Sequence, residues 1–470
     1  MKISKINIPH FQQFQDFKLD LTYPAGHKKA GQPLDKVCLI GQSGTGKTTI
    51  LNQLYQVLLH FFYGTQAELY TVKPPQKFNF SIEASFDNMR LVEIFIANKE
   101  ILIYDPKDDF EVDLPSFFST LVERGYYDKH HTKLVNFPAE TIDSINNILQ
   151  KQTVENPLRN IRTSDNMKEK IIAEREKLAT KTIYNFATDN PLELWKSILL
   201  DLQEYEDARN YYSRQISEAL LENDDMPIET LRQQFRQWKS ENPNPLEDLG
   251  NLLNPVLNQF QLEVNTKAEY KFSEEVKFIQ VNTLSGNNVP YSKWSTGTKQ
   301  VILTATPLFK LNMRNTVVLM DEPERSLYPD LQRMAIDYYS KIAQGAQFFY
   351  ATHSPLVAAS FDPWEIVELY FDEAGKVQRK LYYAGENHVD NYAPHPKYLR
   401  WDEILQQLFG LDAESYDLGN QNLVKASNLK TQIKKHMEAG TMQTVEAQQV
   451  LGEFEQLSQQ LAWQVMNIEP

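Results

Sequence analysis

The chain has 470 residues, 41% hydrophobic and 23% charged, so it can bury a large core and is expected to hold two or three structural units. The formal net charge of −14 argues against a broadly basic surface that binds nucleic acid. A local basic groove is still compatible with this charge, because net charge does not describe how charges are distributed. No run reaches the roughly 18 to 20 apolar residues that cross a bilayer, and the start alternates where a signal peptide would be continuously apolar, so we expect a cytoplasmic protein. The single cysteine, Cys38, excludes an intrachain disulfide and argues against a cysteine-based zinc site.

The first part of the chain is predicted to pass from strands into a helix. Residues 2–8 and 17–21 have the spacing of two short strands around a polar turn. The continuous apolar run at 37–40 is typical of a strand buried on both faces, and leucines then recur at helical spacing from Leu51 to Leu58. A buried strand therefore leads through a glycine-rich bend into a helix.

The next segments are predicted to form a meander and then a helical region. Strict apolar alternation over 78–86, followed by "RLVEIFIA" and "ILIYD", indicates antiparallel strands, and "KLVNFPAE" from Lys133 has the composition of another buried strand. From about 155 to 245 the strand signal disappears. Apolar residues there recur at helical spacing without a sustained heptad pattern, so we expect a helical insertion and no long coiled coil.

Strands are predicted again in "KFIQVNTL", in the apolar run "TVVLMDEP" and in "QFFYATHSP". A helix near 331–343 separates the last two. After a final apolar run at 367–371, the remainder of the chain is mostly helical, polar and rich in glutamine.

The glycine-rich bend, "GQSGTGKTT", fits the phosphate-loop pattern G-x-x-x-x-G-K-[ST]. Glycines let backbone N–H groups turn inward around phosphate oxygens, and the following helix adds the positive end of its dipole. Lys47 can then reach the β- and γ-phosphates, and the Thr48 hydroxyl can ligate Mg²⁺. The residues expected to bind ATP with its Mg²⁺ are Gly41, Gln42, Ser43, Gly44, Thr45, Gly46, Lys47, Thr48 and Thr49.

Two carboxylates follow the strongest apolar run of the second half. Residues 317–320 deliver Asp321 and Glu322 to the end of a strand, where Asp321 can hold the metal and Glu322 can orient or deprotonate the attacking water. A second buried strand ends just before His353, which we expect to contact the γ-phosphate or the water. The expected catalytic residues are Lys47, Glu322 and His353, and the expected metal ligands are Thr48 and Asp321.

These motifs follow one another in the order found in ABC-type ATPases. "STGTKQ", from Ser295, resembles the signature motif, "SLYPD" stands in the place of the D-loop, and "THSP" stands in that of the switch histidine. The sequence is most similar to the soluble ABC ATPases of the RecF, structural-maintenance-of-chromosomes and OLD group (AAA_15- or AAA_21-like), over about 1–145 and 260–370. In that family two chains pack head to tail. The resemblance therefore implies a homodimer or higher homo-oligomer, in which Ser295 and Gly297 of one chain contact the γ-phosphate held by the loop of another.

The same resemblance implies the fold class and the domain organisation. We expect an α/β protein: an ABC-type P-loop ATPase core with an antiparallel β subdomain, a helical insertion and a helical C-terminal region. The first part of the core is expected at 1–150, the insertion at 151–255, the second part of the core with signature, Walker B and switch histidine at 256–372, and a mostly helical region at 373–470.

Some features depart from the family pattern or stay open. Thr298 is unusual in the signature, and Gln150 and Gln152 are candidates for the Q-loop glutamine, with surface helix positions as an equal alternative. His130 and His131 lack a metal-ligand partner at helical or hairpin spacing and are expected in a solvated turn. The acidic clusters of a TOPRIM nuclease are not found after the core, so we expect an ATPase without nuclease activity of its own.

The core, the insertion and a tail containing "LRWDEILQQLFGL" are similar to ATPase subunits of bacterial anti-phage systems such as the Septu, retron-associated and PARIS groups. This resemblance implies a self-associating ATPase that regulates a separate effector, such as a nuclease, by sensing DNA or a phage product. The alternative is a DNA repair or chromosome clamp whose ATP-dependent closure is itself the function, with salt-sensitive DNA binding. A transporter subunit is disfavoured by the large insertion and by "EPERSLYP", and no membrane partner is expected.

Overall fold

The structure is a computed structural model in which contacts divide the chain into two units, Met1–Leu399 and Arg400–Pro470. The residues it describes are 1–64, 80–86, 90–97, 100–105, 110–113, 132–141, 173, 176, 180–189, 192–222, 228–267, 279–311, 313–380, 396–399, 404–405 and 413–460. Gln150, Gln152, His130 and His131 lie outside these residues.

An antiparallel sheet of six described strands begins the first unit, in the order β2-β1-β4-β5-β6-β7. The strands are β1 (Lys2–Phe11), β2 (Phe14–Asp20), β4 (Ser81–Phe86), β5 (Arg90–Ala97), β6 (Glu100–Asp105) and β7 (Phe110–Asp113). The expected meander is present in β4, β5 and β6. The first two strands extend further than the sequence pattern predicted, because pairing continues to Phe11 and Phe14 around a tight turn in which Gln12 has φ +50°.

The second sheet has seven described strands in the order β16-β15-β3-β14-β13-β8-β9, parallel throughout except for β16. The strands are β3 (Lys36–Gly41), β8 (Leu134–Phe137), β9 (Ile183–Asn185), β13 (Val317–Asp321), β14 (Gln347–Ala351), β15 (Ile366–Phe371) and β16 (Val377–Arg379). Residues 37–40 of β3 are fully buried, as expected for a strand covered on both faces. The expectation of no strand in 155–245 is wrong at β9, whose three residues are too few to reveal a strand periodicity.

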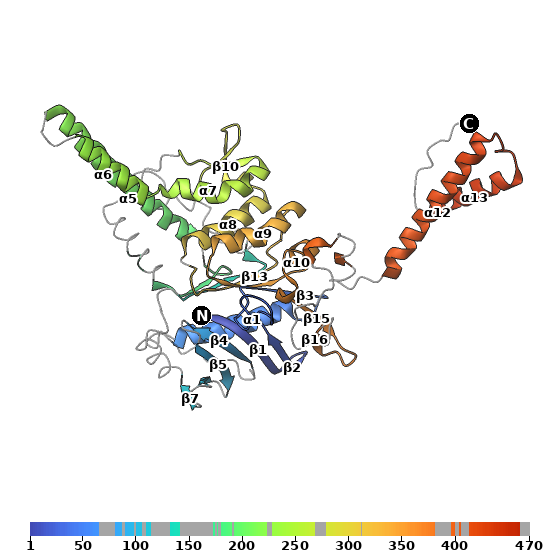
Figure 1. The fold of residues 1–470 in the computed structure, drawn as a ribbon, viewed down its shortest axis with the longest axis horizontal. Coiled ribbons are helices and arrows are strands. Elements are labelled where there is room, and N and C mark those ends of the chain that lie inside the picture. The colour runs from blue at the N-terminus through green and yellow to red at the C-terminus, as the bar shows by residue number, and fades with distance from the viewer. Residues whose placement is uncertain are drawn as a thin grey trace. The chain divides into compact units, whose positions relative to one another are not determined.

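Helix α1 (Lys47–Gly64) lies in the layer between the two sheets (Figure 1). Its residue Leu54 belongs to one hydrophobic cluster with Ile6 and Phe14 of the antiparallel sheet and with Val317 of the parallel sheet. Burying side chains of this size contributes about 1.5–3 kcal/mol each. This shared core holds the start of α1, and with it the glycine-rich loop, against both sheets.

Other helices lie on the side of the parallel sheet away from α1 (Figure 1). They are α7 (Pro245–Leu257), α8 (Thr296–Lys310), α9 (Pro329–Ile342) and α10 (Pro355–Ala358). A three-stranded sheet, β10 (Leu262–Val264), β11 (Val281–Thr283) and β12 (Asn288–Val289), contacts α7. Short 3₁₀ turns are η1 (Asn258–Phe260), η2 (Tyr291–Lys293), η3 (Pro363–Glu365) and η5 (Pro396–Tyr398). Leu253, Val281 and Ile302 share a second hydrophobic cluster, which joins these elements.

Helices α5 (Leu192–Glu222) and α6 (Ile228–Glu241) pack side by side within the segment where helices were expected. Aromatic side chains hold them together: the ring centroids of Tyr205 and Trp238 are 5.2 Å apart, and those of Tyr212 and Phe235 are 5.6 Å apart. Across the described part of the chain, no helix has both the length and the apolar character that a bilayer span requires.

The second unit contains helices α12 (Ala413–Glu438) and α13 (Val445–Gln460) among its described residues. The two pack through Ala426, Leu429 and Leu457. This arrangement agrees with the helical periodicity of the C-terminal sequence.

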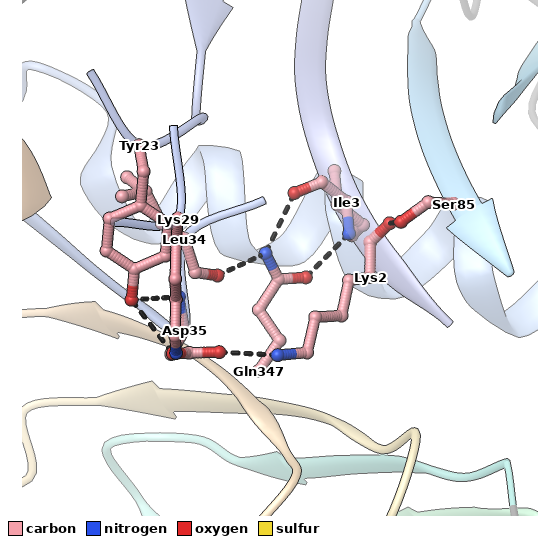
Figure 2. Close-up of polar contacts among 8 residues, drawn as sticks. All are labelled: Lys2, Ile3, Tyr23, Lys29, Leu34, Asp35, Ser85 and Gln347. Atoms are coloured by element: carbon pink, nitrogen blue, oxygen red, sulfur yellow. Dashed lines mark hydrogen bonds and ion pairs between the residues drawn. The ribbon is translucent and has the colours of Figure 1, made fainter. Parts of the chain in front are cut away.

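A buried glutamine ties the two sheets of the first unit together at the start of β14 (Figure 2). The side-chain oxygen of Gln347 accepts a hydrogen bond from Ile3 N at 2.6 Å, and its Nε2 donates to Ile3 O at 2.8 Å and to Leu34 O at 2.9 Å. Beside it, Asp35 forms ion pairs with Lys2 and Lys29. The side-chain amide thus satisfies backbone groups that neither sheet pairs at this position.

We predict that Gln347→Leu lowers the free energy of unfolding by roughly 3 kcal/mol or more, because it leaves three buried backbone groups without a partner. Urea unfolding followed by circular dichroism measures the change. Gln378→Leu is the matched control, since Gln378 donates a longer bond of 3.3 Å to Asp372 and should change stability by less than about 1 kcal/mol. Equal losses in the two variants would contradict the role given to Gln347.

Candidate active site

The glycine-rich loop leaves β3 at Gly41 and enters α1 at Lys47. Gly41 has φ +140°, and a Cβ atom on it would lie 2.2 Å from the carbonyl oxygen of Leu369. Gly46 has φ +88°, and a Cβ atom there would lie 2.5 Å from the ring of Phe14. Both positions therefore require glycine, for conformation and for space.

Lys47 is buried at the mouth of this loop. Its Nζ donates to the carbonyl oxygens of Gly41 at 2.8 Å and Gln42 at 3.1 Å. Burial lowers the pKa of Lys47 to about 8, while the charges of Asp321 and Glu322 act in the opposite direction. The described hydrogen bonds link this ammonium group to neutral carbonyl oxygens, so a phosphate group entering the loop would offer it a charged partner at hydrogen-bond distance.

Thr48 and Asp321 meet across the sheet edge. The Thr48 hydroxyl donates to Asp321 Oδ2 at 2.9 Å, although the two residues are separated by 273 positions. Burial raises the pKa of Asp321 to about 6, and the charges of Glu322 and Glu140 add to the shift, whereas the Thr48 hydrogen bond and Lys47 oppose it. A carboxylate in this setting favours a bound cation.

The donor set fits Mg²⁺. A hydroxyl and a carboxylate are the hard oxygen ligands that this ion prefers. Within the described residues there is no group of three or more His, Cys, Asp or Glu side chains that could hold a metal. Thr48 and Asp321 would therefore bind Mg²⁺ together with phosphate oxygens and water, as is usual for this ion.

Glu322 follows Asp321 in a left-handed backbone conformation, with φ +50°. Its N–H donates to Ala351 O at 2.9 Å, which fixes the turn to the end of the neighbouring strand β14. A non-glycine residue in this region costs about 1–3 kcal/mol, and such strain is found where a site demands a particular side chain.

Glu324 organises the segment after β14 and was not assigned a role from the sequence. Its Oε1 accepts hydrogen bonds from Thr352 Oγ1 at 2.6 Å, from His353 N at 3.2 Å and from Ser354 N at 3.2 Å. Its Oε2 is buried and has no hydrogen-bond partner among the described residues. Burial raises the pKa of Glu324. The signal in the sequence was the second acid of "DEPE", but its contact with Thr352 depends on the sheet register.

His353 lies beside the same group of charges, with an exposed side chain. Partial desolvation of its ring lowers the pKa of His353, the positive charge of Lys47 lowers it further, and Glu322 opposes both. The pKa of His353 therefore lies below its usual value beside Lys47 and Glu322. The structure brings together Lys47, Thr48, Asp321, Glu322 and His353.

Ser295 and Gly297 have other neighbours. Ser295 caps α8: its Oγ accepts from Thr298 N at 3.1 Å and shares a hydrogen bond of 2.8 Å with Thr298 Oγ1. A Cβ atom on Gly297 would lie 2.8 Å from the carbonyl oxygen of Ser326, so the signature turn packs against the "SLYPD" turn. Thr298, unusual for the family, completes the cap.

Comparison with solved structures gives SMC head domains at low identity. The Smc head domain of Pyrococcus furiosus with an extended coiled coil, bound to the C-terminal domain of ScpA, is 12% identical with a TM-score of 0.40, covering 81% of this chain and 96% of that one. An SmcHead bound to the C-winged helix domain of ScpA is 12% identical, with a TM-score of 0.42 and coverage of 81% and 98%. The SMC head domain from Thermotoga maritima is 10% identical, with a TM-score of 0.38 and coverage of 81% and 98%.

No curated protein matches the chain. The family profile described as AAA ATPase domain (AAA_15) matches residues 1–358. This match confirms the resemblance to a phosphate-loop ATPase that the sequence motifs indicated. Because the match spans well over half of the sequence, the chain belongs to the AAA ATPase domain family.

Proposed function

We propose that this chain hydrolyses Mg-ATP at the edge of its parallel sheet and that two copies associate to do so. The proposal that the chain hydrolyses Mg-ATP rests on the hydrogen bond of 2.9 Å between Thr48 and Asp321, because this bond joins the phosphate loop to the strand that ends in a carboxylate. Bound Mg²⁺ would neutralise the charge that develops on the phosphates during transfer.

Each residue near that point has a role in the proposal. Lys47 and the loop N–H groups hold the phosphates, and Thr48 and Asp321 hold the metal. Glu322, the residue after Asp321, accepts a proton from the attacking water or orients it. His353 can donate a hydrogen bond to a phosphate oxygen or to the water, and Glu324 positions the segment that carries it.

Association of two copies is supported by the surface around the signature turn. Ser295 is exposed at the start of α8, whose first N–H groups can bind an anion. Tyr328, in the turn that packs against Gly297, is 70% exposed. A large exposed aromatic side chain beside a helix start favours a protein contact at this place. We place Ser295 and Gly297 on the γ-phosphate of a second copy.

We further propose that the ATP-dependent association of two copies regulates a separate effector protein, such as a nuclease, in anti-phage defence. The sequence resemblance to defence ATPases supports this part. Native purification with ATP followed by mass spectrometry tests it: a co-purified nuclease or toxin supports regulation of an effector, whereas a permease would replace it with a transport function.

Glu322→Gln is predicted to slow hydrolysis by about 100-fold or more, because the amide cannot accept the proton, and to trap the ATP-bound dimer. Light scattering with Mg-ATP measures the dimer, and phosphate release measures hydrolysis. Lys47→Ala is the control and should stay monomeric. A Glu322→Gln variant that remains monomeric with Mg-ATP contradicts the two-copy mechanism.

A mixing experiment tests whether the signature acts on the other copy. Lys47→Ala and Ser295→Arg should each be inactive alone, since one lacks the phosphate ligand and the other blocks the signature. In a mixed dimer, one of the two sites combines the intact loop of one copy with the intact signature of the other, so an equal mixture should recover activity, up to about half of the wild-type rate. No recovery from a mixture that light scattering shows to be dimeric argues for action within one chain.

Glu324→Ala is predicted to lower kcat roughly 10-fold without raising KM, as is usual when an orienting group is removed from a reactive side chain. Glu324→Gln keeps an acceptor oxygen for the same three donors and should retain most of the activity. Thermal unfolding midpoints separate positioning from folding. Equal kcat values for the alanine variant and wild type would remove Glu324 from the mechanism.

A further inference from the structure

Phe371 is an apolar side chain left 40% exposed beside the phosphate loop. It ends β15, which pairs with β3 so that Leu369 lies opposite Gly41. Beyond that pair, β15 continues alongside the loop, and a Cβ atom on Gly44 would lie 3.9 Å from Cζ of Phe371. The aromatic ring is therefore in van der Waals range of the exposed part of the loop.

Hydrogen bonds from three segments fix this position. Phe371 pairs with Val377 of β16, and Val377 N donates to Gln13 O at 3.0 Å. The side-chain Nε2 of Gln13 then donates to Gly44 O at 3.2 Å. These hydrogen bonds connect the β15–β16 hairpin, the β1–β2 turn and the phosphate loop to one another.

The order of the sheet gives a bound nucleotide its direction. Asp321 ends β13 and Glu322 follows it, while His353 comes after the end of β14, so all three lie on one side of β3. Strand β15 lies on the other side of β3. A nucleoside triphosphate whose terminal phosphate faces the carboxylates can extend its sugar and base toward the opposite side, where Phe371 lies.

We propose that Phe371 is the stacking platform for the purine base of the nucleotide, an inference that rests on the proposed ATP-binding function. Aromatic side chains bind bases through their π faces, and the larger purine gains more from this contact than a pyrimidine. Tyr370, 39% exposed, points to the opposite face of the strand because successive side chains alternate. It therefore serves as the matched control.

Calorimetric titration of the full chain with ADP and with pyrophosphate tests the platform, because only ADP carries a base. Phe371→Ala should weaken ADP binding roughly 10-fold or more and leave pyrophosphate binding unchanged, whereas Tyr370→Ala should change neither. Phe371→Trp should keep ADP affinity and show added fluorescence quenching with ADP but not with pyrophosphate.

The outcomes separate this inference from the function on which it rests. If Phe371→Ala binds ADP as tightly as wild type, or loses both ligands equally, the proposal that Phe371 stacks on the base is wrong. If the wild-type chain binds neither ligand, the proposed ATP site is wrong. Lys47→Ala should lose both ligands, which checks that pyrophosphate binding reports on the loop.

Discussion

Parallel register in the second sheet brings the candidate site residues of this protein to one edge. Asp321 pairs with Ala351, and Ala351 pairs with Leu39, so β13 and β14 end at the same level and β3 continues just beyond it to Gly41. Three segments are neighbours for this reason: the acids Asp321 and Glu322, the switch segment at 352–354, and the glycine-rich loop. A shift of one strand along another would separate Thr48 from Asp321 and Glu324 from Thr352.

The same strand, β14, connects this edge to the rest of the first unit. Its first residue, Gln347, binds the backbone of β1 through its side chain, and the residue after its end, Thr352, donates to Glu324. Five residues therefore link the antiparallel sheet to the switch segment. The side chains between these ends are all buried, so little freedom is left for β14 to slide.

The sequence predicted the α/β fold and the residues that meet at the edge of the parallel sheet, because the signals for both are local. The apolar run, the glycines and the leucine periodicity of residues 37–58 each occupy one stretch of chain, and so does the run that precedes Asp321. What escaped prediction depends on distant partners. Strand β9 exists because β8 offers it an edge, and Glu324 becomes a buried acceptor only when β14 lies beside β13. The position of the Phe14 ring, which leaves no space for a Cβ atom on Gly46, likewise depends on the folded β1–β2 turn.

The left-handed conformation of Glu322 has a consequence for how the protein tolerates change. A glycine there would relieve the backbone strain, so the residue that folds most easily at this position is one that cannot perform proton transfer. Under the proposed role of Glu322 in proton transfer, stability and activity are therefore opposed at this residue. Selection for stability alone would replace Glu322 with glycine. A chain that keeps Glu322 therefore has a less stable turn than one with glycine at this position.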